Sequence, residues 1–207
     1  MNNPTHIDAL DYAKDVATRM ESVSIKEYFL RRDRKTKWLI EEEWPLACIG
    51  KILYHPDRRI KVLYRGPDGV PDGEMIVEGR QKSIEEWDDV TPVEITSVQY
   101  TESHLVRKEL GTTGSSVGSA RDIDDDIKKF IPEAIECLRN KYDHQPPYPQ
   151  NSIIVCAIFP EKSFGRLDCN MLLDGISEQL AGAIKHKTVI LDTFTCQHFV
   201  LRTDRSR

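Results

Sequence analysis

Hydrophobic residues recur at two different spacings along the chain, and these spacings divide it into helices and strands. Apolar residues three and four positions apart predict helices over residues 5–20, 122–142 and about 171–185. Thr5 or Asp8 is expected to cap the first of these, and a short helix follows Ser22 or Ser24. Pro132 is expected to kink the long helix or to divide it in two.

Short runs of apolar and β-branched residues predict the strands. These runs lie at residues 47–54, 59–64, 74–78, 92–97, 153–159, 188–194 and 197–202. The first two are expected to form a hairpin around His55-Pro56-Asp57-Arg58. Residues 153–159 are almost all apolar, which is typical of a central strand covered on both faces. This order of helices and strands predicts an α/β fold around one mixed sheet.

Composition and length limit the class of protein. The chain has 207 residues, with 39% hydrophobic and 30% charged, which is an ordinary balance for one globular domain. We expect a single domain, with a helical part at 1–44, a core at 45–160 and a C-terminal helix and strands at 161–207. The net charge of −5 argues against a polybasic nucleic-acid binder, but a local basic cleft is compatible with it.

The chain shows no pattern of a membrane or secreted protein. No stretch approaches the ~18 apolar residues of a membrane span, and the N-terminus lacks the pattern of a signal peptide. The five cysteines are widely spaced and form none of the close pairs that zinc sites favour. We therefore expect a cytoplasmic protein with free thiols and no membrane partner.

Two carboxylates lie at strand positions in the middle of the chain. Asp72 stands where a Gly- and Pro-rich loop becomes a strand, and Glu94 lies inside the next strand. There Glu94 and Thr96 share one face, and Val93 and Ile95 share the other. If the two strands pair, Asp72 and Glu94 lie side by side and offer the oxygen ligands that Mg²⁺ or Mn²⁺ prefers. The alternative is that Asp72 caps a turn and Glu94 pairs with a surface cation.

The segments Pro71-Asp72 and Val93-Glu94-Ile95-Thr96, in their order of helices and strands, resemble the PD-(D/E)XK nuclease superfamily. The resemblance covers roughly residues 21–160. It implies a restriction-endonuclease-like fold, a mixed central β-sheet flanked by helices, here with a helical N-terminal part. It also implies hydrolysis of phosphodiester bonds, with DNA as the expected substrate and Mg²⁺ or Mn²⁺ held by Asp72 and Glu94.

A glutamate on a helix often completes the site in this superfamily. The resemblance points to Glu27 for that role, with Glu21 and Glu41 to Glu43 as alternatives.

The sequence departs from the family motif at one position. The family lysine should follow Glu94 by two residues, where this chain has Thr96. One interpretation is that Lys82 or Lys108 supplies the cation from elsewhere. Another is that the metal activates water with help from Thr96 or Gln99. The third is a catalytically inactive nuclease fold that binds nucleic acid or a protein partner, and a chance match in an unrelated α/β protein is a weaker alternative.

Nucleic-acid contacts are expected from two basic regions. The residues concerned are Arg31, Arg32, Arg34 and Lys35 in the first region, and His104, Arg107 and Lys108 in the second. A solvated helix end or a loop is the alternative for the first region. Residues 161–207 exceed the minimal fold and could extend the sheet or form a homodimer surface.

Overall fold

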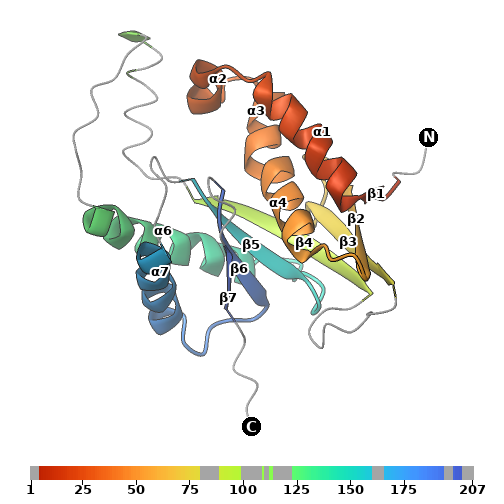
Figure 1. Cartoon of the computed structure of the whole chain (residues 1–207). Helices are drawn as coiled ribbons and strands as arrows, with labels where there is room; N and C mark the ends of the chain where they lie inside the picture. The colour runs from red at the N-terminus through yellow and green to blue at the C-terminus, as the bar shows by residue number, and fades with distance from the viewer. Residues whose placement is uncertain are drawn as a thin grey trace.

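The structure is a computed structural model that describes residues 5–79, 89–98, 109, 112–113, 123–159, 166–193 and 198–201. Within these residues a mixed sheet forms the middle layer, and helices cover both of its faces (Figure 1). The expected α/β class with one mixed sheet is therefore confirmed. None of the helices in the described part combines the length and the apolar character needed to cross a membrane.

The strands lie in the sheet in the order in which they occur along the chain. Their bounds are β1 (Ile7–Asp8), β2 (Arg58–Tyr64), β3 (Gly73–Gly79), β4 (Val90–Val98), β5 (Ile153–Ile158), β6 (Lys187–Asp192) and β7 (His198–Leu201). The strands β1 to β4 are antiparallel to their neighbours, β4, β5 and β6 are parallel, and β7 returns antiparallel to β6. The central strand β5 is buried at all six positions, as its apolar sequence predicts.

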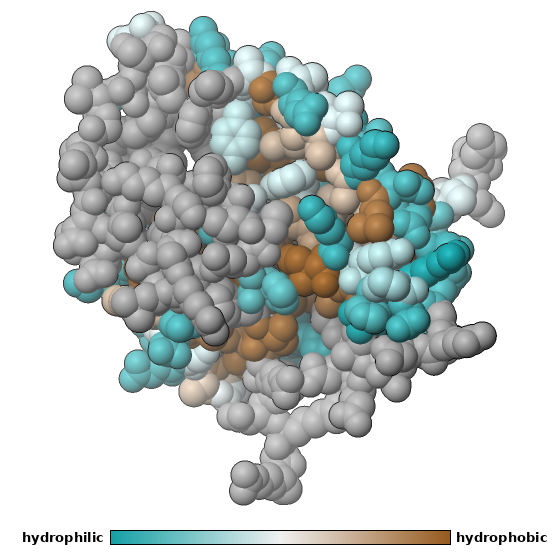
Figure 2. Space-filling view, viewed as in Figure 1, coloured by the Kyte–Doolittle hydropathy of each residue, from teal (hydrophilic) through white to brown (hydrophobic). Residues whose placement is uncertain are grey.

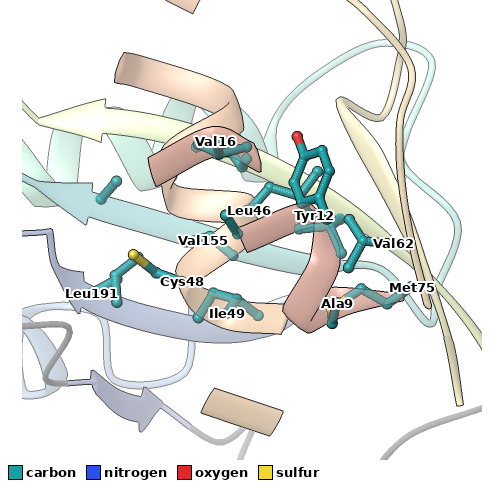
Figure 3. Close-up of a cluster of buried hydrophobic side chains, with 14 of the residues drawn as sticks. Ala9, Tyr12, Val16, Leu46, Cys48, Ile49, Val62, Met75, Val155 and Leu191 are labelled. Atoms are coloured by element: carbon teal, nitrogen blue, oxygen red, sulfur yellow. The ribbon is translucent and has the colours of Figure 1, made fainter. Parts of the chain in front are cut away.

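The N-terminal helices cover one face of the sheet. They are α1 (Ala9–Glu21), α2 (Ile25–Leu30), α3 (Arg34–Trp38), a π-helical turn η1 (Leu39–Glu43) and α4 (Trp44–Leu53). Leu46 and Cys48 of α4 pack in one apolar cluster with Val155 and Leu191 of the sheet (Figure 3). Hydrophilic side chains predominate on the outer side of α1 (Figure 2).

The helices α6 (Ile123–Tyr142) and α7 (Arg166–Gln179) cover the opposite face. A second apolar cluster there joins Leu138 and Ile176 of these helices to Ile154 of β5. The two helices approach closely because α7 has a glycine at the contact. A Cβ atom at Gly175 would lie 2.5 Å from Cδ1 of Ile131.

The strand predicted at 47–54 is wrong, because this segment belongs to the helix α4. Residues 45 to 50 are buried at every position, so the helix is apolar around its whole circumference and shows no helical period. Pro45 lies in its first turn, where a proline is tolerated. The predicted hairpin is therefore a helix-to-strand connection at residues 55–58.

The other predicted elements agree with the structure apart from their ends. Asp8 caps α1 and Ser24 caps α2, as predicted. The helix α6 continues through Pro132 without division, and α7 begins at Arg166, earlier than expected.

Candidate functional site: acidic residues where two strands part

The candidate site lies where β3 and β4 separate. The two strands pair over Gly73–Ile76 and Val90–Val93, and the same register, continued by one residue, brings Asp72 opposite Glu94. Beyond this point β4 continues alongside β5, its partner on the other side. The Asp72 Oδ2 atom accepts a hydrogen bond of 2.7 Å from the backbone N–H of Ile95. A carboxylate thus replaces the strand partner that this N–H has lost.

Close packing holds Asp72 in this position. The next residue is Gly73, where a Cβ atom would lie 2.8 Å from Leu46 Cδ2 and 3.0 Å from the carbonyl oxygen of Leu63. The carbonyl oxygen of Asp72 also accepts a hydrogen bond of 2.9 Å from the backbone N–H of Arg65. The backbone at Asp72 is therefore fixed by α4 on one side and by the end of β2 on the other.

Glu94 points toward α6 and is buried, with 3% of its surface exposed. Its Oε1 atom forms an ion pair with the ammonium of Lys141, at the end of α6. The same oxygen accepts a hydrogen bond of 2.9 Å from the hydroxyl of Tyr148. Its Oε2 atom is buried and has no hydrogen-bond partner among the residues that the structure describes. A buried carboxylate oxygen without a partner is costly, so this atom marks a place for a cation or a proton.

A third carboxylate, Glu42, comes from the π-helical turn η1. The hydroxyl of Tyr64 donates a hydrogen bond of 2.5 Å to its Oε2 atom. Burial raises the pKa of Glu42, and the charges of Glu41 and Glu94 raise it further, against the hydrogen bond from Tyr64 and the charge of Lys141. The carboxylates of Glu42 and Glu94 therefore act on each other although they come from opposite faces of the sheet.

The pKa of Asp72 is also raised by burial and by the neighbouring carboxylates. Burial raises its pKa to about 7, and the neighbouring charge of Glu94 contributes next. The N–H of Ile95 and the ammonium of Lys141 oppose this rise, and Glu42 adds to it. Asp72 therefore exchanges a proton near neutral pH, which is unusual for an aspartate.

The three consecutive glutamates of η1 contact three different partners. Glu41 pairs with the buried Arg31 at 2.7 Å, and Glu43 pairs with Arg19 of α1 at 2.6 Å. Glu42, between them, points to the strands and contacts Tyr64. A π-helical turn is rare and often marks a functional site, and here its flanking ion pairs fix the orientation of the middle residue.

Among the described residues, the site holds more negative than positive charge. Glu42, Asp72 and Glu94 interact electrostatically there, and the ammonium of Lys141 acts on each of them. In the part of the chain that the structure describes, no three His, Cys, Asp or Glu side chains converge tightly enough to enclose a metal ion. Two carboxylates still suit Mg²⁺, which commonly keeps several water ligands and completes its shell with substrate phosphates.

Several predicted site residues lie elsewhere. Glu27 is exposed, and its carboxylate forms a capping box with Ser24 at the start of α2, so its predicted role in completing the site stays a prediction. The assignment of Arg31 is corrected, because its guanidinium is buried against Glu41 and the ring of Phe159. Thr96 lies on the same strand face as Glu94, but its side chain is buried and hydrogen-bonds the thiol of Cys137.

The remaining predicted contacts divide into two groups. Arg32, Arg34 and Lys35 are exposed, at and just before the start of α3. A second group lies outside the described residues and comprises Lys82, Gln99, His104, Arg107 and Lys108.

Lys141 and Tyr148 are not among the site residues predicted from the sequence. One signal was present for the lysine, because Lys141 follows Ala134 and Leu138 at helical spacing on the buried stripe of α6. A charged residue in line with an apolar stripe needs a buried partner, and here Glu94 is that partner. Tyr148 lies in a proline-rich segment, and no spacing pattern links it to the site.

The chain was compared with protein-family models, with curated proteins and with solved structures, and none of them matches it. The function is therefore inferred from the site itself.

Proposed function

We propose that the protein is a metal-dependent nuclease of the PD-(D/E)XK type, with Mg²⁺ or Mn²⁺ as its cofactor. The observation that carries the proposal is the pairing of Asp72 with Glu94 where two strands part, with an unpartnered buried oxygen on Glu94. These two carboxylates would hold the ion, and Glu42 stands close enough to act on both electrostatically.

The arrangement of elements around the pair supports a restriction-endonuclease-like core. A helix (α4) precedes three antiparallel strands (β2, β3 and β4), and a helix (α6) then leads to β5, which is parallel to β4. Asp72 immediately precedes the second of these strands, and Glu94 lies in the middle of the third. This is the order of elements that the family resemblance implies.

Lys141 supports an active site in spite of the threonine at the motif position. Its ammonium contacts Glu94 from α6, so a cation reaches the acidic pair from a different element. With 27% of its side chain exposed, it lies at the border between the buried carboxylate and solvent. There it can orient an attacking water and stabilise the negative charge that develops on a phosphate. A bound Mg²⁺ would supply Lewis-acid activation of the phosphate and of water.

DNA is the substrate that we propose, with contacts from the exposed basic residues near the start of α3. Arg32, Arg34 and Lys35 are exposed on the segment that leads into η1, the turn that carries Glu42. Such residues would neutralise backbone phosphates without reading sequence.

Cleavage and ion binding are the two measurements that test this proposal. Plasmid and single-stranded DNA are incubated with Mg²⁺ or Mn²⁺, and ion binding is followed by calorimetry and thermal shift. We expect cleavage by the natural protein and its loss, by at least about a hundredfold, in Asp72→Asn, Glu94→Gln and Lys141→Met, since charge-stabilising groups contribute at this scale. Asp72→Asn and Glu94→Gln should also lose ion binding, whereas Lys141→Met should keep it.

Lys61 offers a matched control. Its ammonium also pairs with a glutamate on a neighbouring strand, Glu78, at 2.8 Å, but away from the acidic pair. Lys61→Met should therefore cleave DNA normally. Ion binding without any cleavage would favour the inactive nuclease fold, for which Thr96 is the supporting feature. Absence of ion binding would overturn the metal site altogether.

A further inference from the structure

We propose that Lys141 and Tyr148 together clamp one oxygen of Glu94, so that only its Oε2 atom is left for the ion and the site selects Mg²⁺ or Mn²⁺ over Ca²⁺. This inference rests on the proposed function, because it concerns the ion at the same site. It assigns to Tyr148 the role of a positioning residue that acts through Glu94.

Both donors contact the same oxygen from separate segments. The ammonium of Lys141 comes from the last turn of α6, and the hydroxyl of Tyr148 comes from the connection between α6 and β5. Both bind Oε1, while Oε2 stays buried without a partner. At 3% exposure Glu94 is shielded from solvent, so water does not compete with these two donors for its carboxylate.

The phenol of Tyr148 is itself held in place by aromatic contacts. Its ring stacks on His144 with centroids 4.7 Å apart and planes 17° apart, and it meets the ring of His186 edge-on at 6.3 Å. The residue is buried, with 6% of its surface exposed. A hydroxyl on a ring packed in this way keeps its hydrogen bond to Glu94 at little cost in side-chain entropy.

The clamp favours an ion that needs only one oxygen from Glu94. Mg²⁺ requires near-octahedral geometry and is commonly bound through one or two carboxylates with water. Ca²⁺ takes 6–8 oxygen ligands, and both oxygens of one carboxylate often bind it together. With Oε1 committed to Lys141 and Tyr148, Glu94 cannot provide that second oxygen without breaking both contacts.

The test compares ion affinities in variants of the full chain. Mg²⁺, Mn²⁺ and Ca²⁺ are titrated by calorimetry into the natural protein, Tyr148→Phe and Tyr142→Phe. In Tyr148→Phe we expect the affinity for Ca²⁺ relative to Mg²⁺ to rise about fivefold, the change that corresponds to one lost hydrogen bond. A purely structural role of Tyr148 would weaken both ions alike and leave the ratio unchanged.

Tyr142→Phe is the matched control. Its hydroxyl is also buried and hydrogen-bonded, to Thr188 at 2.6 Å, but it does not contact Glu94. We expect a loss of stability and no change in the ion ratio. Lys141→Met provides a second test of the clamp if Tyr148→Phe does not fold, because it removes the other donor from Oε1 and should also raise the ratio of Ca²⁺ to Mg²⁺ affinity.

The outcomes separate the clamp from the proposed function. If the natural protein binds no divalent ion, or binds it equally well after Asp72→Asn, the metal site itself is wrong. If binding depends on Asp72 but the Ca²⁺ to Mg²⁺ ratio is unchanged in the folded Tyr148 and Lys141 variants, the clamp is wrong and the metal site stands.

Discussion

Asp72 combines a fixed backbone with a carboxylate that is ill suited to carry its charge. Burial and the neighbouring Glu94 raise its pKa to about 7, whereas an aspartate in the unfolded chain titrates near 3.8. Between these values the folded protein holds a proton that the unfolded chain has released. The free energy of unfolding must therefore fall as the pH rises through this window.

The fall in the free energy of unfolding with rising pH leads to a prediction for Asp72→Asn in the absence of metal. Asparagine keeps an oxygen for the N–H of Ile95 but carries no charge. We expect the variant to match the natural protein at about pH 4 and to exceed its free energy of unfolding by on the order of 2 kcal/mol at about pH 8, allowing for partial screening by water. Urea unfolding in EDTA at both pH values measures this difference. Equal pH dependence in the two proteins would contradict the assignment.

The proton on the Asp72 carboxyl group also determines how ion binding depends on pH. A metal ligated by Asp72 must displace the proton that this carboxylate holds below about pH 7. We expect the apparent Mg²⁺ affinity to rise about tenfold per pH unit up to this value and to level off above it. Calorimetry in buffers of different ionisation enthalpy would also count the released proton. An affinity that does not change between about pH 5.5 and about pH 8 would exclude Asp72 as a ligand.

At the scale of elements, the sequence predicted the strands of the site and the helix α6, but not the helix α4 or the contact that α6 makes with Glu94. The pattern of apolar and polar residues in β3 and β4 predicted that these strands pair near Asp72 and Glu94, and they do. The pairing of adjacent antiparallel strands can be predicted because their register depends mainly on local pattern. The contact from Lys141 to Glu94 joins residues 47 positions apart and depends on how α6 packs on the sheet. No local pattern contains that information. The prediction of a strand in place of the helix α4 failed because this helix is buried on all sides over residues 45 to 50, which removes the helical period of apolar residues.

The junction of α4 with β3 leads to a prediction for Gly73→Ala. The added methyl group would overlap Leu46 Cδ2 at 2.8 Å and crowd the carbonyl of Leu63, so β3 or α4 must shift. We expect a loss of about 1–3 kcal/mol in the free energy of unfolding and a weaker thermal shift with Mg²⁺, because Asp72 moves with its neighbour.

Gly182→Ala serves as the control for this variant. Gly182 has a φ of 74°, and apart from its chain neighbours no atom of the described residues lies within 4 Å of the position of its Cβ, so alanine there adds backbone strain without a clash. It should lower stability while the Mg²⁺ response persists. If Gly73→Ala loses stability but keeps the full Mg²⁺ response, the packing of α4 does not position Asp72.

At the scale of the whole molecule, the charge is unevenly distributed. The chain carries a net charge of −5, yet exposed basic residues gather on the segment before the acidic turn η1. If DNA crosses this segment, its affinity should depend on the phosphates that these residues neutralise. We expect Arg34→Gln with Lys35→Gln to weaken DNA binding uniformly across sequences. The slope of log affinity against log salt should fall by up to about 0.9 for each lost phosphate contact.

Exposed basic residues elsewhere on the molecule provide a control for the reduced salt dependence of DNA binding in Arg34→Gln with Lys35→Gln. Like Arg34 and Lys35, the residues Lys51 and Arg59 are exposed, and they lie at the end of α4 and at the start of β2. Tyr64, which contacts Glu42 of the site, lies at the opposite end of β2. Lys51→Gln with Arg59→Gln removes the same charge from the molecule, so a general field effect would alter both double variants alike. Fluorescence anisotropy with Ca²⁺ in place of Mg²⁺, at salt concentrations from about 50 to about 200 mM, separates the two cases. A reduced slope in the α3 variant alone would show that the DNA passes over the start of α3, whereas equal slopes would place its path elsewhere on the surface.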